Sequence, residues 1–198
     1  MALPALGFFA AVQFLTRIPI RLRSAPDLSA SIPWSPVVGA RAGATGGGVP
    51  AVLGYRVPPT VAATVAVLVG VVITGAFHED GLADSCDAMG GWSQQQRREI
   101  LKDSRHGSYG VAAMCGTILV RVVALASLGP AAAFGGAIAA HTLGRGAAVA
   151  AMGLARAVPT EGLGADYARS LSPSRTAIGV VPTLLEDPQH DRVEGPGL

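Results

Sequence analysis

The sequence predicts an all-α protein, a polytopic helical bundle embedded in a membrane with about five transmembrane helices. Charged residues make up 14% of the chain and hydrophobic residues 50%, whereas typical soluble domains carry about 25% charged residues. Several apolar stretches approach the roughly 20 residues that a spanning helix needs. The chain also holds 26 glycines, which suits helices that pack closely within a bilayer.

Five apolar stretches account for the expected helices. They are residues 3–20, 34–54, 57–77, 111–129 and 131–153. The third is the strongest candidate for a span, because none of its residues is charged. Whether residues 34–54 span is left open, because Arg41, three consecutive glycines and Pro50 interrupt the stretch.

Lysine and arginine gather in the polar segments on one side of these spans. The segments hold Arg17, Arg21 and Arg23 after the first stretch, Arg97, Arg98, Lys102 and Arg105 after the third, and Arg156, Arg169 and Arg175 after the last. The two intervening turns hold only Arg56. Because cytoplasmic loops are enriched in basic residues, we expect a multi-pass protein of the cell membrane, with membrane lipid as a partner and residues 78–110 in the cytoplasm.

The composition argues against several other classes of protein. The net charge is only +2, and no basic block with interleaved aromatic residues occurs, so no nucleic-acid partner is expected. Cys86 and Cys115 lack the spacing of a metal site and are too few for a disulfide framework. We expect one membrane-embedded domain, residues 1–170, and a polar tail, residues 171–198, that is disordered or atypical because it is rich in proline and acids.

A run of acidic residues directly follows the most apolar stretch. Asp80, Asp84 and Asp87 have the spacing i, i+4, i+7, which places three carboxylates on one face of a helix. These like charges repel one another unless a cation lies between them. Mg²⁺ favours carboxylate oxygens together with waters and substrate phosphates. We therefore expect these three aspartates to bind Mg²⁺, and Glu79 could add a further ligand.

A second polar patch, LKDSRHGSYG at residues 101–110, complements the acidic run. The residues expected to bind substrate are Lys102, Arg105, His106, Gly107 and Gly110. Arginine and lysine suit phosphate groups, and glycines let a ligand approach the backbone closely. Asp103 is a candidate catalytic acid or ligand beside Asp80, Asp84 and Asp87. Together the two patches predict metal-assisted phosphoryl transfer.

Other ionisable residues leave alternatives open. His141 and Arg145 lie four positions apart and share a helix face, so they either serve the function or pack against each other within the bundle. Arg121 lies in the middle of a span, where it needs a partner, and an acidic-run carboxylate could supply one. His78 either polarises a carboxylate or lies at the membrane interface.

The two patches together resemble a known family. HEDGLADSCDAMGGW followed by LKDSRHGSYG is similar to the paired motifs of the cobalamin synthase family, the adenosylcobinamide-GDP ribazoletransferases, and FLTRIPI resembles the family's opening segment. The resemblance covers roughly residues 8 to 170. Ala88 stands where the family usually has glycine. The family's later apolar spans and glycine-rich motif have no counterpart, which implies a member without the usual C-terminal part.

The resemblance implies an integral membrane enzyme of late cobalamin biosynthesis. Such an enzyme joins adenosylcobinamide-GDP to α-ribazole or its 5′-phosphate and releases GMP, with Mg²⁺ as cofactor. Two alternatives stay open: a small-solute or cation transporter, and a catalytically impaired remnant of the transferase. A transporter would show acids near the centres of paired spans and an internal repeat, and neither pattern occurs. Association into a homo-oligomer is also left open.

Overall fold

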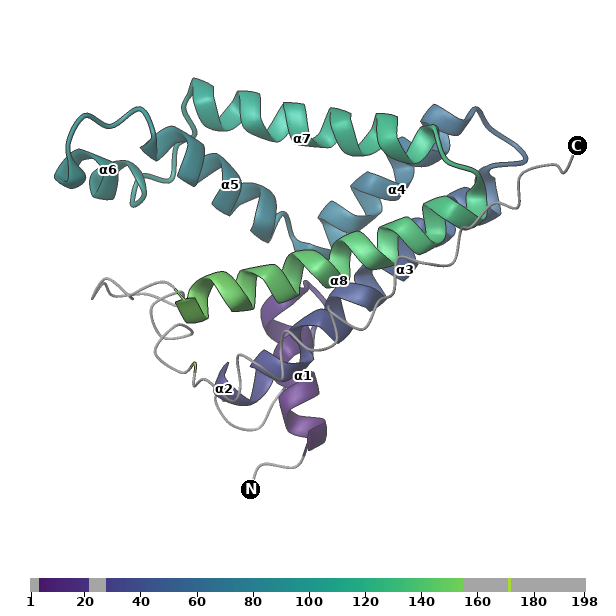
Figure 1. Ribbon diagram of the computed structural model, residues 1–198, viewed down its shortest axis with the longest axis horizontal. Coiled ribbons are helices and arrows are strands. Elements are labelled where there is room, and N and C mark those ends of the chain that lie inside the picture. The colour runs from purple at the N-terminus through teal and green to yellow at the C-terminus, as the bar shows by residue number, and fades with distance from the viewer. Residues whose placement is uncertain (1–3, 22–27, 155–170, 172–198) are drawn as a thin grey trace, which may run out of the picture.

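The computed structural model describes residues 4–21, 28–154 and 171, and every regular element within them is a helix. The elements are α1 (Pro4–Leu15), α2 (Leu28–Ser31), the 3-10 helix η1 (Ile32–Trp34), α3 (Ser35–Leu53), α4 (Pro59–Thr74), α5 (Phe77–Ala88), α6 (Gln94–Ile100), α7 (Ser108–Ala126) and α8 (Pro130–Leu154). This confirms the all-α class. Figure 1 shows α3, α4, α7 and α8 running roughly along the long axis of the molecule, with α1 and α2 beneath α3 and α8.

Helices α3 and α8 lie side by side along much of their length (Figure 1). Three glycines of α3, Gly39, Gly43 and Gly47, face α8. A Cβ atom at Gly39 would lie 2.5 Å from the carbonyl oxygen of His141, shorter than real Cβ contacts. Small residues at a spacing of four let two helices approach to backbone contact. The glycines that weakened the prediction for residues 34–54 therefore form the packing face of a helix.

Helices α4 and α5 meet at a bend of 88°. Gly75 and Ala76 join them with φ angles of 66° and 58°, a left-handed conformation that glycine adopts freely and that costs alanine about 1–2 kcal/mol. Arg17 lies against this turn: its backbone N–H donates to the carbonyl oxygen of Ile73 at 2.7 Å, and its side chain occupies the space that a Cβ at Gly75 would need. The uncharged stretch 57–77 is therefore not one straight helix.

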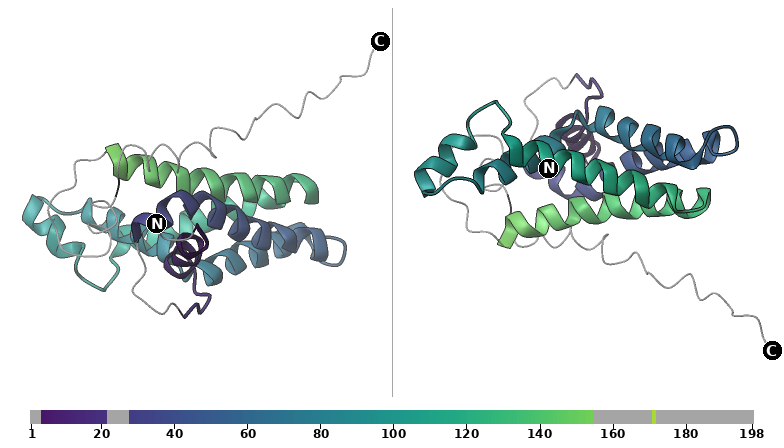
Figure 2. Two further views of the ribbon diagram at one scale, coloured as in Figure 1. Left: turned by 90° about the horizontal axis from the view of Figure 1, so that it is seen from below. Right: turned by 90° about the horizontal axis from the view of Figure 1, so that it is seen from above.

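Helix α7 lies alongside both α4 and α5, and Figure 2 shows it on the outside of the bundle when viewed from above. Its apolar side chains Leu119, Val120 and Val123 are 63%, 68% and 67% exposed. Among the described helices, α7 alone is long and apolar enough to cross a membrane by itself, and α4 and α5 qualify together as a bent pair. The arrangement with five spans stays a prediction.

Helix α1 is shorter than the expected first span, residues 3–20, because it ends at Leu15. Pro19 follows, and proline disfavours helical backbone in itself and in the residue before it. The apolar side of α1 packs against α3 in a core of Ala11, Val12, Leu15 and Val38. Leu171 is the one described residue of the expected tail, so the domain boundary near residue 170 also stays a prediction.

Candidate active site

Asp80 and Asp84 lie one turn apart on α5, and His106 reaches both from the loop that precedes α7. The Nε2 atom of His106 is 3.4 Å from Oδ1 of Asp80, and its Nδ1 atom is 3.7 Å from Oδ1 of Asp84. One possible ligand atom from each of the three side chains lies within 4.8 Å of the other two. The sequence predicted that His106 contacts substrate, whereas the structure groups it with two of the predicted metal ligands.

The loop that carries His106 is shaped by an ion pair between Asp103 and Arg105. Their Oδ2 and Nη2 atoms are 2.7 Å apart, and the backbone N–H of Arg105 donates to Oδ1 of Asp103. Hydrogen bonds from the Arg105 side chain lower the pKa of Asp103 to about 2. The Arg105 side chain is 86% exposed, and Lys102 is exposed in the same loop. The catalytic and phosphate-binding roles of these three residues stay predictions.

Asp87, the third aspartate of the α5 face, bonds to the start of α7. Its Oδ2 atom accepts a hydrogen bond from the backbone N–H of Gly107 at 2.7 Å, and its Oδ1 atom accepts one from Gly110 at 2.9 Å. Gly107 is the residue before the first turn of α7, and Gly110 lies within that turn. The first N–H groups of a helix have no partner inside it. One carboxylate therefore caps α7 from 20 residues away in the sequence.

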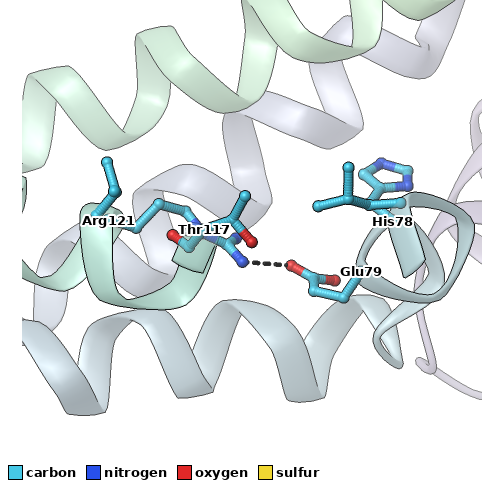
Figure 3. A pocket seen from close by; sticks show the side chains of 6 residues that line it. His78, Glu79, Thr117 and Arg121 are labelled. Atoms are coloured by element: carbon cyan, nitrogen blue, oxygen red, sulfur yellow. Dashed lines mark hydrogen bonds and ion pairs between the residues drawn. The ribbon is translucent and has the colours of Figure 1, made fainter. Parts of the chain in front are cut away.

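Glu79, the fourth predicted metal ligand, forms an ion pair with Arg121 of α7 (Figure 3). The Oε1 atom of Glu79 is 2.8 Å from Nη2 of Arg121, and Glu79 is 7% exposed. This contact matches one expectation for Arg121, that an acidic-run carboxylate partners it. Oε2 of Glu79 is buried and finds no hydrogen-bond partner among the residues that the structure describes. A pocket of about 420 Å³ lies beside the pair and is also lined by His78 and Thr117.

A larger cavity of about 660 Å³ adjoins the metal-ligand group, and most of its lining surface is apolar. Asp80 and Asp84 contribute to the wall from α5, while Arg145 and Val149 contribute from α8 and Phe14 from α1. The sequence patterns did not indicate that the first and last described helices enclose the acidic run. The sequence predicted a helix at residues 131–153, but its only sign that this helix belongs to the site was the pair of ionisable residues, His141 and Arg145, in an apolar stretch.

The residues present fit a divalent cation. Asp80 and Asp84 offer carboxylate oxygens, the ligands that Mg²⁺ favours, and His106 adds a nitrogen that also suits Mn²⁺ or other transition metals. The three side chains are partly exposed, and Asp80 and Asp84 also line the cavity, which leaves positions for water or phosphate oxygens. Glu79 and Asp87 already have protein partners, and their role as ligands stays a prediction.

Comparison with known proteins identifies the family of the chain. Residues 7–186 match the family of cobalamin-5-phosphate synthases. The chain belongs to this family. A relative from Azorhizobium caulinodans, named adenosylcobinamide-GDP ribazoletransferase, is 41% identical over 151 residues, which cover 70% of this chain and 56% of the relative.

Further members of the cobalamin-5-phosphate synthase family agree with this assignment. Adenosylcobinamide-GDP ribazoletransferases from Shewanella frigidimarina and Ralstonia nicotianae are 37% and 36% identical, over 70% and 72% of this chain and 56% and 58% of their own lengths. The chain thus spans little more than half the length of the curated relatives it matches. No solved structure matches it.

Proposed function

We propose that the chain carries the acidic centre of a membrane transferase that joins adenosylcobinamide-GDP to α-ribazole, or its 5′-phosphate, and releases GMP. The observation that carries the proposal is the grouping of Asp80, Asp84 and His106 at the wall of a cavity of about 660 Å³. Relatives with the corresponding enzyme name support the substrates. The largely apolar wall suits a bulky substrate whose reacting end is charged.

Mg²⁺ is the proposed cofactor, held by Asp80, Asp84 and His106. When bound, it would neutralise the charge of the diphosphate and of the departing phosphate. In this proposal Asp87 does not bind the metal. It fixes the start of α7 and with it the position of His106. Asp103 and Arg105 shape the loop on the other side of His106.

In the proposed reaction, a hydroxyl oxygen of α-ribazole attacks the phosphorus that bears the corrinoid arm. A new phosphorus–oxygen bond forms, the bond between this phosphorus and the GMP oxygen breaks, and GMP leaves with the electron pair. A carboxylate of the α5 acidic face accepts the hydroxyl proton. Apolar side chains of the cavity wall, among them Phe14, Phe77 and Val149, keep water from competing with the ribazole hydroxyl.

The proposed location is the cell membrane, with about five spans and the acidic centre facing the cytoplasm. The exposed apolar side of α7 supports contact with lipid, because such a surface is rare on monomeric soluble proteins. The α3–α4 and α7–α8 turns lie at the same end of the bundle (Figure 1), where a Cβ at Gly54 would lie 3.8 Å from Pro130. These turns are poor in basic residues, and α6 with its two arginines lies at the opposite end.

The test is release of GMP by the purified chain supplied with adenosylcobinamide-GDP, α-ribazole and Mg²⁺. Asp80→Asn and Asp84→Asn should each lower the rate roughly 100-fold or more, since each removes a group that acts on the charge of the transition state. Glu99→Gln removes the same charge from the exposed surface of α6 and should leave the rate unchanged. Near-normal rates in both aspartate variants would refute the proposed centre.

The same assay separates the alternatives that the sequence leaves open. A fusion that adds the remaining length of the Azorhizobium relative serves as the comparison, because the relatives are longer than this chain. GMP from the fusion alone would favour the impaired remnant, and no GMP from either protein would count against the transferase. Nothing among the relatives favours the transporter.

A further inference from the structure

Arg145 of α8 is a buried cation that has no carboxylate partner among the described residues. The residue is 7% exposed, and its Nε atom has no hydrogen-bond partner in the part of the chain that the structure describes. Its Nη1 atom lies 2.9 Å from Nδ1 of His141 and 3.4 Å from the same residue's carbonyl oxygen. No ion pair within 4.0 Å joins Arg145 to any carboxylate of residues 4–21, 28–154 or 171.

The contacts with His141 do not compensate the charge of Arg145, and Glu79, the described carboxylate that acts on Arg145 electrostatically, is already paired with Arg121. A guanidinium only donates hydrogen bonds, so Nδ1 of His141 must accept, which makes this imidazole the neutral form. Burying a cation is costly unless an anion pairs with it. An anionic ligand would supply the negative charge that Arg145 lacks beside it and would also accept a hydrogen bond from the free Nε–H.

The position of Arg145 indicates which ligand that is. Arg145 lines the cavity of about 660 Å³ from α8, and Asp80 and Asp84 line it from α5. Gly39 of α3 makes room for the guanidinium arm, since a Cβ there would lie 2.6 Å from Cδ of Arg145. The cavity therefore has a cation on one wall and a metal-ligand group on another, an arrangement that suits a diphosphate between them.

The other cations near the site are already engaged or face solvent. Arg105 pairs with Asp103 and its side chain is 86% exposed. Arg121 pairs with Glu79 and belongs to the smaller pocket. Arg145 lines the cavity, whereas Arg105, Lys102 and Arg121 do not.

We propose that Arg145 binds the diphosphate of a guanosine diphosphate ester, its guanidinium donating two hydrogen bonds to non-bridging oxygens. Arg145 is thus a substrate-positioning residue of the cavity that also holds Asp80 and Asp84. The inference rests on the proposed function for the identity of the ester, but its test does not need turnover.

The experiment measures the affinity of the purified full chain for GDP in the presence of Mg²⁺ by calorimetry. Arg145→Gln should weaken GDP binding roughly 10- to 100-fold, the range expected for lost hydrogen bonds to a charged group. Arg145→Lys keeps the charge but not the planar pair of donors, so its loss should be smaller. Arg41→Gln is the matched control: Arg41 is exposed on the same bundle and stacks over the Phe8 ring at 5.0 Å.

Binding of Mn²⁺ without nucleotide, followed by electron paramagnetic resonance, shows whether each variant keeps its fold and its acidic group. Unchanged Mn²⁺ binding with weakened GDP binding in both Arg145 variants supports the proposal. GDP affinity equal to that of Arg41→Gln, or no GDP binding by the unmodified chain, would overturn it. GDP binding that depends on Arg145, in a chain and fusion that release no GMP, would overturn the proposed function and leave this inference standing.

Discussion

The Asp87 carboxylate accepts a hydrogen bond from the backbone N–H of Gly110 at 2.9 Å, across 23 residues of sequence. Its other oxygen accepts the N–H of Gly107. A single side chain thus joins the acidic helix α5 to the first turn of α7. Gly107 and Gly110, the glycines of the second sequence patch, are three positions apart and both contact the Asp87 carboxylate. This contact within the protein accounts for glycine at both positions without a bound ligand.

Asp87→Asn is expected to loosen this junction. An amide oxygen can accept one of the two hydrogen bonds, but the amide nitrogen cannot accept the other. The free energy of unfolding should fall by about 1–2 kcal/mol, the usual effect of losing a helix cap. Mn²⁺ affinity should fall only a few-fold, because Asp80 and Asp84 stay in place and only the position of His106 is loosened. Thermal unfolding and Mn²⁺ titration check both results. A loss of Mn²⁺ affinity of roughly tenfold or more at unchanged stability would instead identify Asp87 as a metal ligand.

Gly110→Ala should destabilise the protein, because its Cβ would meet Oδ2 of Asp87 and lie 2.8 Å from the carbonyl oxygen of Ala83. We expect a loss of about 1–3 kcal/mol, as for other overpacked positions. Gly116→Ala, on the same helix, is the control because nothing lies within 4 Å of its Cβ position. It should be neutral or slightly stabilising, since alanine favours helix over glycine. Equal melting temperatures for the two variants would contradict the close approach of α5 and α7.

The Glu79–Arg121 pair should act as a unit. Removing Arg121 leaves the Glu79 carboxylate buried without its partner, which typically costs about 3–5 kcal/mol, whereas removing Glu79 leaves an Arg121 side chain that is 38% exposed and costs less. Arg121→Met should therefore lower the melting temperature strongly and Glu79→Gln less so, and the double variant should be less destabilised than the sum of the two. A double-mutant cycle of unfolding free energies measures this coupling. Additive effects would show that the 2.8 Å contact contributes little.

The pH dependence of the Asp103–Arg105 pair follows from its lowered pKa. The pKa of Asp103 falls from its ordinary value of 3.8 to about 2, because the Arg105 side chain donates hydrogen bonds to the ionised carboxylate. A lowered pKa means that the stabilisation is complete above the unfolded value and is lost as the pH falls toward 2. The difference in melting temperature between the unmodified chain and Asp103→Asn should thus be the same at pH 5 and pH 8. A difference that changes between these two values would contradict the assignment.

The acidic helix was predictable because its evidence is local. Asp80, Asp84 and Asp87 recur at helical spacing, and α5 does place them on one helix. The bend before α5 was not predictable, since the stretch 57–77 is uncharged throughout and only Gly75 and Ala76 mark the place where the helix ends. At the bend, the backbone N–H of Arg17, from a distant segment, donates to the carbonyl oxygen of Ile73, a contact that the local sequence does not indicate.

The sequence by itself determined the all-α class, the acidic face and the family, because periodicity, charge and motif spacing depend on neighbouring residues. Only the tertiary structure decided which partner each of those residues contacts. It grouped His106 with Asp80 and Asp84, turned Asp87 to cap α7, paired Glu79 with Arg121 and brought Arg145 to the same cavity. These contacts join segments 20 to 65 residues apart, and their partners are fixed by helix packing, which the order of residues does not display.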